Sequence, residues 1–210
     1  MTEHTRQVYY YPNKMGRIVL QAMEEVISHA GLVAVLNLAH LPHRIEMLPP
    51  NNLERVFQFD ELSQLLTTVQ VLYGSRAGCG LALRTGRVCF KYGLREFGPL
   101  VGSTEMGFRL LPLEAKLRVG ANLLVEVFNK YSDQQVHVEE RGDAFLWHID
   151  RCPVCWQRQA TEPVCHLAVG VLQEALYWVS GGKYFNVEET HCIAKGDPRC
   201  TILIDKQVIE

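Results

Sequence analysis

Cysteine is concentrated in the C-terminal part of this chain. Five of its seven cysteines stand at positions 152, 155, 165, 192 and 200 of the 210-residue sequence. A carboxylate, Glu189, precedes the fourth of them by three residues. Zinc in proteins takes four ligands drawn from thiolate, imidazole and carboxylate groups. The spacing therefore predicts a metal site that draws together segments far apart in the sequence.

The composition is typical of a soluble globular protein in a reducing compartment. An odd number of cysteines and a polar N-terminus without a signal-peptide pattern predict a cytoplasmic location. A net charge of −2, without a dense Lys/Arg cluster, argues against a nucleic-acid partner. No apolar run reaches about 18 residues, which predicts that the chain has no membrane span.

The N-terminal half, residues 14–131, is predicted to be mainly helical. Apolar residues recur at helical spacing over 14–30 and over 113–131, and Asp60 is a suitable N-cap for a helix between them. Four glycines lie within 73–86, but their spacing matches neither a phosphate loop nor a dinucleotide fingerprint. We expect this glycine-rich stretch to pack closely against another helix.

The C-terminal half, residues 132–205, is predicted to have the order ββαββ. Apolar residues alternate on both sides of a turn at 141–143, and a second hairpin ends the chain. Between the hairpins, Thr161 is expected to cap a helix that Pro163 opens. Residues 1–210 are therefore expected to form a single α+β domain, with the helical N-terminal half packed on an antiparallel sheet.

The strand pattern selects candidate metal ligands. Glu189 falls among apolar residues on one strand face, where a carboxylate needs a partner or a cation. Cys192 and Cys200 flank the turn of the terminal hairpin on neighbouring strands. Cys165 is expected in the first turn of the preceding helix, where the helix dipole favours a thiolate. These four residues can complete a tetrahedral site.

The Cys152-Pro-Val-Cys155 pair has three interpretations. It can bind metal, act as a redox pair, or do neither. A redox pair of the thioredoxin type lies at a helix N-terminus, and the helix expected from Pro163 begins too late to stabilise a Cys155 thiolate. Redox catalysis is therefore disfavoured.

Three segments resemble a known family. Residues 163–166 and 187–202 are similar to the C-terminal signature of 4-vinyl-reductase-type domains, and residues 76–93 are similar to that family's glycine-containing helical region. The resemblance implies the α/β fold shared with haem-based nitric oxide sensors and with domains of a vesicle-tethering complex. Family members include the sensory domains of phenol-responsive transcription activators and small proteins linked to bacteriochlorophyll synthesis.

The resemblance also implies a structural zinc beside a ligand pocket, held by three cysteines and one glutamate. Those ligands correspond to Cys165, Glu189, Cys192 and Cys200, which is the set that the strand faces also favour. The phenol sensors lack the Cys152/Cys155 pair in their zinc site. A rival set therefore stays open, consisting of Cys152, Cys155, Cys192 and Cys200.

For function, we expect a sensor or carrier domain that binds an aromatic, hydrophobic or tetrapyrrole-like molecule in an apolar pocket. The aromatic residues expected to line it are Trp147 first, then Tyr92, Phe97, Phe108 and Trp178. No catalytic arrangement and no flavin, nicotinamide or iron–sulfur motif stands out, so an enzyme is less favoured. The alternatives are an enzyme or accessory factor in (bacterio)chlorophyll vinyl-group reduction, and a protein–protein adaptor. A homodimer is expected to pack through the 14–30 helix.

Overall fold

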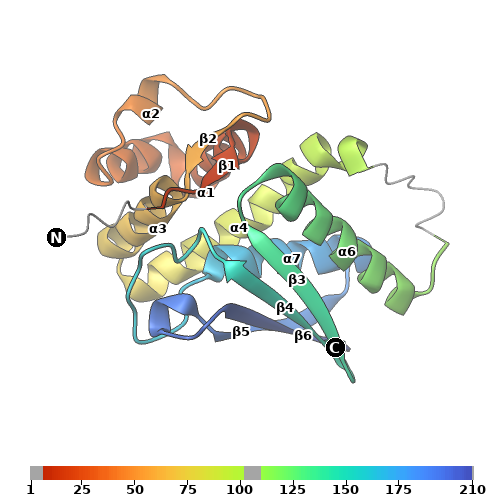
Figure 1. Ribbon diagram of the computed structural model, residues 1–210. Helices are drawn as coiled ribbons and strands as arrows, with labels where there is room; N and C mark the ends of the chain where they lie inside the picture. The colour runs from red at the N-terminus through yellow and green to blue at the C-terminus, as the bar shows by residue number, and fades with distance from the viewer. Residues whose placement is uncertain (1–6, 102–109, 210) are drawn as a thin grey trace.

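The N-terminal part of the molecule is a group of helices with a small two-stranded sheet (Figure 1). The structure is a computed structural model that describes residues 7–101 and 110–209. The elements are β1 (Tyr10–Pro12), α1 (Asn13–Leu38), α2 (His43–Glu46), β2 (Arg55–Gln58), α3 (Phe59–Tyr73), α4 (Ser75–Phe97), the 3-10 helix η1 (Gly98–Val101) and α6 (Leu113–Tyr131). Strands β1 and β2 pair antiparallel, which places the start of α1 beside the start of α3.

The C-terminal part is a four-stranded antiparallel sheet with one helix inserted. Its elements are β3 (Gln135–Arg141), β4 (Ala144–Arg151), α7 (His166–Ser180), β5 (Tyr184–His191), the 3-10 helix η2 (Ile193–Lys195) and β6 (Cys200–Ile209). The strand order is β3-β4-β6-β5. Helices α4, α6 and α7 lie over one face of this sheet (Figure 1). The predicted α+β class and ββαββ order are confirmed.

Helix α1 is longer than predicted. It leaves helical geometry at Ser28, where φ is 68°, and then continues to Leu38. By length and composition alone it could cross a membrane. However, residues along its length, including Leu20 and Val35, are fully buried in the protein core. Helix α1 therefore acts here as a core helix.

The start of α3 differs from the prediction because a capping box replaces the expected cap. The helix begins at Phe59, and Gln58 is the N-cap instead of Asp60. The Gln58 side chain accepts from the backbone of Glu61, and the Glu61 side chain accepts from the Gln58 backbone N–H. Arg44 also forms a bidentate ion pair with Glu61, at 2.8 and 2.9 Å.

The start of α7 also differs from the prediction. The helix begins at His166 with Cys165 as its N-cap, so neither Thr161 nor Pro163 is helical. The backbone N–H of Cys165 donates to a carboxylate oxygen of Glu189 at 2.7 Å. This long-range bond satisfies a donor at the helix N-terminus and fixes where the helix begins.

Helices α4 and α7 cross at two glycines. A Cβ added at Gly86 would lie 2.1 Å from the carbonyl oxygen of Leu167, and one added at Gly170 would lie 2.0 Å from that of Leu83. Both contacts are with backbone atoms, so any side chain at either position would push the helices apart. For Gly86, the expectation of close helix packing is confirmed.

Candidate functional site

Five cysteines and Glu189 meet at the end of the sheet next to α7. Cys152 and Cys155 lie in the segment that follows β4, and Cys165 is the N-cap of α7. Glu189 lies in β5, Cys192 follows that strand, and Cys200 begins β6. All six side chains are buried. Segments from the whole C-terminal part therefore converge on one point, which we call the cysteine cluster.

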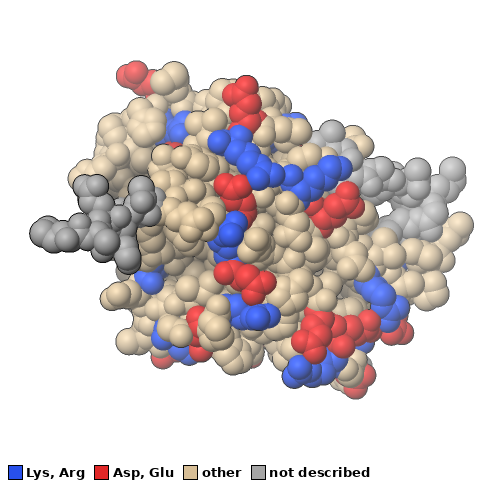
Figure 2. Space-filling model, viewed as in Figure 1, with Lys and Arg blue, Asp and Glu red and all other residues tan. Residues whose placement is uncertain are grey.

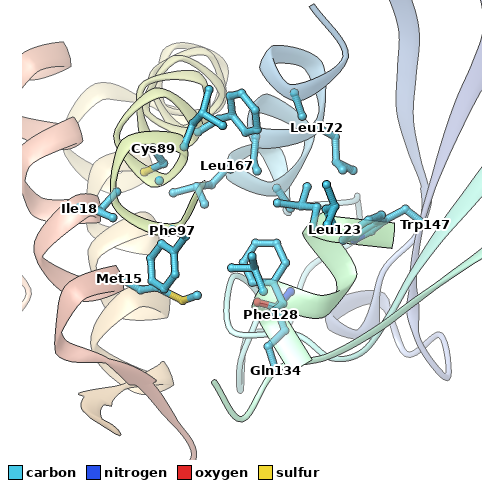
Figure 3. Close-up of a pocket in the computed structure, with 18 of the residues that line it drawn as sticks. Met15, Ile18, Cys89, Phe97, Leu123, Phe128, Gln134, Trp147, Leu167 and Leu172 are labelled. Carbon is cyan, nitrogen blue, oxygen red and sulfur yellow. The ribbon is translucent and has the colours of Figure 1, made fainter. Parts of the chain in front are cut away.

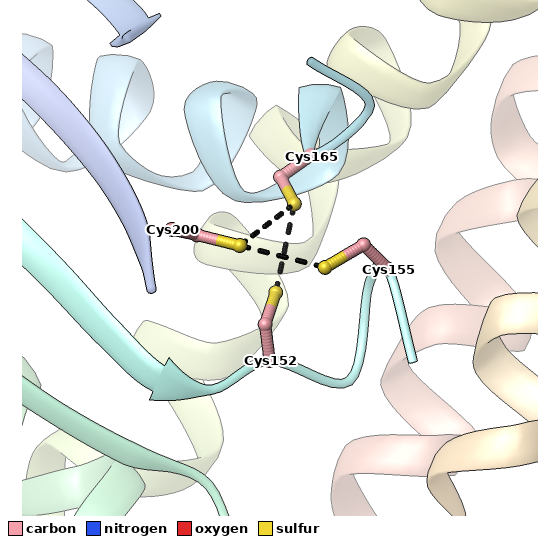
Figure 4. A group of neighbouring side chains, drawn as sticks. All are labelled: Cys152, Cys155, Cys165 and Cys200. Atoms are coloured by element: carbon pink, nitrogen blue, oxygen red, sulfur yellow. Dashed lines mark hydrogen bonds between the residues drawn. The ribbon is translucent and has the colours of Figure 1, made fainter. Parts of the chain in front are cut away.

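The sulfur atoms lie at the separations expected for ligands of one metal ion. With Zn–S bonds of about 2.3 Å, the sulfurs of a tetrahedral site are about 3.8 Å apart. The Sγ of Cys165 lies 3.5 Å from that of Cys152, 3.8 Å from that of Cys192 and 3.7 Å from that of Cys200. Cys200 Sγ lies 3.4 Å from Cys155 Sγ and 4.0 Å from Cys192 Sγ. Figure 4 shows four of these side chains pointing toward a common centre.

Two groups of four donors are each compact enough to hold an ion. The donor atoms of each group lie within 4.8 Å of one another. The first group is Cys152, Cys155, Cys165 and Cys200, and the second is Cys165, Glu189, Cys192 and Cys200. The structure thus brings together the four ligands favoured from the sequence. It joins the Cys152/Cys155 pair to Cys165 and Cys200, whereas the rival set had Cys192 in place of Cys165.

The surroundings of Glu189 suit a cation. As predicted, this residue shares a buried strand face with Phe185 and Val187. Its Oε2 accepts the Cys165 N–H, but its Oε1 is buried without a hydrogen-bond partner among the described residues. Burial raises the pKa of the Glu189 carboxyl, because a charged group is costly to remove from water. A bound cation would offset that cost.

The thiols of the cluster are poised for the same chemistry. Burial raises the pKa of the Cys152 thiol, whereas hydrogen bonds, first from Cys152, lower the pKa of Cys155. The backbone N–H of Ile193 donates to Cys200 Sγ at 3.3 Å, which favours negative charge on that sulfur. His166 is half-buried and His191 is exposed, and neither belongs to a donor group. The donor set therefore fits a soft divalent ion bound by sulfur and one oxygen.

A second feature is an apolar cavity of about 180 Å³ between the helices and the sheet (Figure 3). Helices α1, α4, α6 and α7 and strand β4 contribute its walls. Its apolar lining includes Met15, Ile18, Phe97, Leu123, Phe128, Trp147, Leu167 and Leu172. Tyr11 and Gln134 add polar groups, and the Tyr11 hydroxyl donates to Gln134 Oε1 at 2.5 Å. The cavity therefore combines an apolar wall with one polar corner.

Three of the five aromatic residues selected from the sequence line this cavity. Trp147 is 2% exposed and meets the ring of Phe128 edge-on at 6.4 Å, and Phe97 and Trp178 also contribute. Tyr92 is not among the lining residues, and its hydroxyl donates to Glu25 instead. Phe108 lies outside the described residues.

Sequence reasoning missed the polar corner and one thiol. Tyr11 stands in a three-residue strand and Gln134 in a connector, so no periodic pattern could place either beside a cavity. Cys89 was assigned to core packing, and it is buried but also lines the cavity. Burial raises the pKa of Cys89 to about 12, so this residue presents a neutral thiol.

The metal cluster and the cavity share a wall. Val154 lies between Cys152 and Cys155, Leu167 lies two residues after Cys165, and both line the cavity. Ile149, another lining residue, is the register partner of Cys200. The cysteine cluster therefore holds the chain segments that shape one side of the cavity.

Comparisons with known proteins agree with this architecture. An H-NOX protein from S. oneidensis in the Fe(II)NO ligation state aligns with a TM-score of 0.56 and 11% identity, over 92% of this chain and 99% of that one. The Fe(II) unliganded H-NOX protein from K. algicida gives a TM-score of 0.57 at 14% identity, over 95% of this chain and 97% of that one. Both share the fold of this chain.

A third structure is the phenol-responsive sensory domain of the transcription activator PoxR with phenol. It aligns with a TM-score of 0.53 and 20% identity, over 72% of this chain and 77% of that one. A search of curated proteins finds no match. The family model of the 4-vinyl-reductase domain matches residues 147–206, a segment that contains all six residues of the cysteine cluster. The C-terminal part of this chain is therefore a 4-vinyl-reductase domain, of the type related to phenol-responsive sensory domains.

Proposed function

We propose that this protein is a sensor or carrier that binds a single-ring aromatic molecule in the apolar cavity, with a structural zinc behind one wall. The observation that carries this proposal is the 180 Å³ apolar cavity with its Tyr11–Gln134 corner. The relation to 4-vinyl-reductase domains and to a phenol-responsive sensory domain supports a small-molecule-binding role.

The volume of the cavity sets the size of the ligand. An engineered apolar cavity of about 150 Å³ binds benzene. A cavity of about 180 Å³ therefore accommodates one aromatic ring with a small substituent. Pockets for drug-sized ligands span about 300–1,000 Å³, so a tetrapyrrole would require the helices to move apart. The cavity thus favours a phenol-sized ligand over the tetrapyrrole alternative.

The polar corner sets the chemistry of the ligand. Because the Tyr11 hydroxyl donates to Gln134 Oε1, the Tyr11 oxygen can still accept and the Gln134 amide nitrogen can still donate. A ligand hydroxyl satisfies both roles. We therefore expect phenols to bind more tightly than hydrocarbons of the same shape, by about tenfold for one additional hydrogen bond of ~1.4 kcal/mol.

For the metal, we propose zinc bound by Cys165, Glu189, Cys192 and Cys200. The support is the tetrahedral spacing of the sulfurs and the unpartnered Glu189 oxygen. A zinc ion with four protein ligands has no open position for a reaction, so it would act by joining the end of the sheet to α7. The described cavity lining contains no carboxylate, imidazole or ammonium group, which favours a binding role over vinyl-group reduction.

The cellular setting follows from the chemistry of the surface and of the thiols. All seven cysteines are free, so we propose the cytoplasm as the location. Basic and acidic side chains are interspersed on the face shown in Figure 2, which does not favour a nucleic-acid partner. The apolar face of α1 is buried within its own core, so the 14–30 helix is a poor dimer interface.

The ligand proposal is tested by titrating the full chain with phenol and with benzene under isothermal calorimetry. We expect phenol to bind more tightly than benzene, and Ala175→Phe to abolish both signals because Ala175 lines the cavity. Ala77→Phe, on the exposed surface of α4, is the matched control and should bind normally. If no single-ring aromatic binds, or if Ala175→Phe binds like the control, the proposed function is wrong.

A further inference from the structure

We propose that the cysteine cluster holds two metal ions, which share Cys165 and Cys200 as bridging ligands. The inference extends the proposed zinc site, and rests on it for the ion bound by Glu189 and Cys192. The second ion would be bound by Cys152 and Cys155. The two donor groups overlap in these two bridging cysteines.

The number of donors matches two four-coordinate ions. Six donor side chains are present, and two of them belong to both groups, which gives eight coordination positions. Zinc modules that hold two ions with six cysteines have the same count, because two thiolates must then serve both metals. Here five thiolates and one carboxylate would do so. A single ion in either group would leave two buried donors without a metal.

The distances place the Cys152/Cys155 pair around the bridging sulfurs in the same way as the other pair. Cys152 Sγ lies 3.5 Å from Cys165 Sγ, and Cys155 Sγ lies 3.4 Å from Cys200 Sγ. The bridging sulfurs are themselves 3.7 Å apart, close to the edge of about 3.8 Å that a tetrahedral zinc–sulfur site requires. This edge belongs to both tetrahedra.

Charge favours the second ion. With all six donors ionised, one divalent ion would leave a net charge of −4 in a buried site, and two ions would leave −2. Uncompensated charge is costly where water is excluded, and the cysteines of the cluster are at most 1% exposed. The alternative is that some thiols stay protonated, but thiolates are the form that binds metal. The N-terminus of α7 and the Ile193 N–H add partial positive charge at the bridging sulfurs.

The experiment counts ions per chain. The full chain is produced with zinc in the medium, freed of loose metal by desalting, and measured by native mass spectrometry and elemental analysis. Two zinc ions per chain are expected. One ion per chain would overturn this inference while leaving the single zinc site intact. No zinc, or iron with inorganic sulfide, would overturn both proposals.

Matched variants assign the two ions. The double variant Cys152→Ser/Cys155→Ser and the double variant Glu189→Gln/Cys192→Ser should each bind one ion instead of two. Cys79→Ser, which changes a half-buried cysteine on α4, should still bind two. If the Cys152→Ser/Cys155→Ser protein keeps two ions, the inference is wrong.

A measurement on the unmodified chain covers the case in which a double variant fails to fold. Replacing zinc by ¹¹³Cd²⁺ should give two cadmium NMR signals, one from a site with four sulfurs and one from a site with three sulfurs and an oxygen. Because the ions share two thiolates, the signals should split each other by cadmium–cadmium coupling. A single signal, or two signals without coupling, would refute the bridged arrangement.

Discussion

The α4–α7 crossing makes a sharp prediction about stability, since a methyl group at one glycine should disrupt it. In Gly170→Ala the new Cβ would lie 2.0 Å from the Leu83 carbonyl oxygen and 2.9 Å from its carbon. These are backbone atoms inside a helix, so they cannot rotate away as a side chain does. Relief requires the two helices to separate along their contact.

The magnitude follows from two opposing effects. Alanine is favoured over glycine in a helix by about 1 kcal/mol. Overpacking in a tightly packed core costs about 1–3 kcal/mol, and occasionally more, and a contact this short lies at the upper end. We therefore expect Gly170→Ala to lower the free energy of unfolding by about 2 kcal/mol or more. For a chain of this size that corresponds to about 4–8 °C in Tm.

Gly80→Ala on α4 provides the matched control, because a Cβ there meets nothing within 4 Å. Its Tm should stay the same or rise, since only the helix propensity changes. The assay is thermal unfolding followed by circular dichroism and repeated with urea. A Gly170→Ala protein as stable as the original, or a Gly80→Ala protein equally destabilised, would refute the argument from close packing. Phenol binding should weaken only in Gly170→Ala, because α4 and α7 both line the cavity.

Further predictions concern the polar corner, one buried histidine and the metal. Tyr11→Phe should lower stability by about 1–3 kcal/mol in urea unfolding, because Gln134 Oε1 loses its donor in a buried site; an unchanged midpoint would contradict this. Burial, aided by the charges of neighbouring His137 and Arg199, lowers the pKa of His148, so the unfolded chain binds more protons between the folded-state pKa and about 6.5. Stability should therefore fall as pH drops below about 6.5, and His148→Gln should reduce that slope in Tm measured from pH 7.5 to 5.5; an equal slope would exclude His148 as a source. Chelation at neutral pH should lower the Tm of the zinc-loaded chain, and a Tm that ignores the chelator would argue against a structural ion.

The elements with strong local signals could be predicted from the sequence. Helix α6 runs over Leu113–Tyr131, the same bounds that the apolar spacing predicted, because its own periodicity determines it. The hairpin of β3 and β4 likewise turns at the predicted Gly142-Asp143. Strand parity also placed Glu189 on the buried face, since side chains alternate along a strand whatever its neighbours are.

The features that depend on distant contacts could not be predicted. The start of α7 is set by the bond from Cys165 to Glu189, which lies 24 residues away in sequence. The polar corner of the cavity joins Tyr11 to Gln134 across 123 residues. The approach of Cys152 to Cys165 depends on the path of a connector that has no periodic pattern. In each case a tertiary contact determines the geometry, and one sequence does not encode that contact as a local signal.

The position of the cluster explains why a binding protein would contain so many metal ligands. The segment from Cys152 to Cys165 has no helix or strand of its own, yet Val154 from this segment forms part of the cavity wall. An irregular segment has little to hold its shape, and its ordering costs conformational entropy. Metal–thiolate bonds at both ends would supply the missing constraint. Ligand and metal then favour the same arrangement of this wall, so each should strengthen the binding of the other by the same factor.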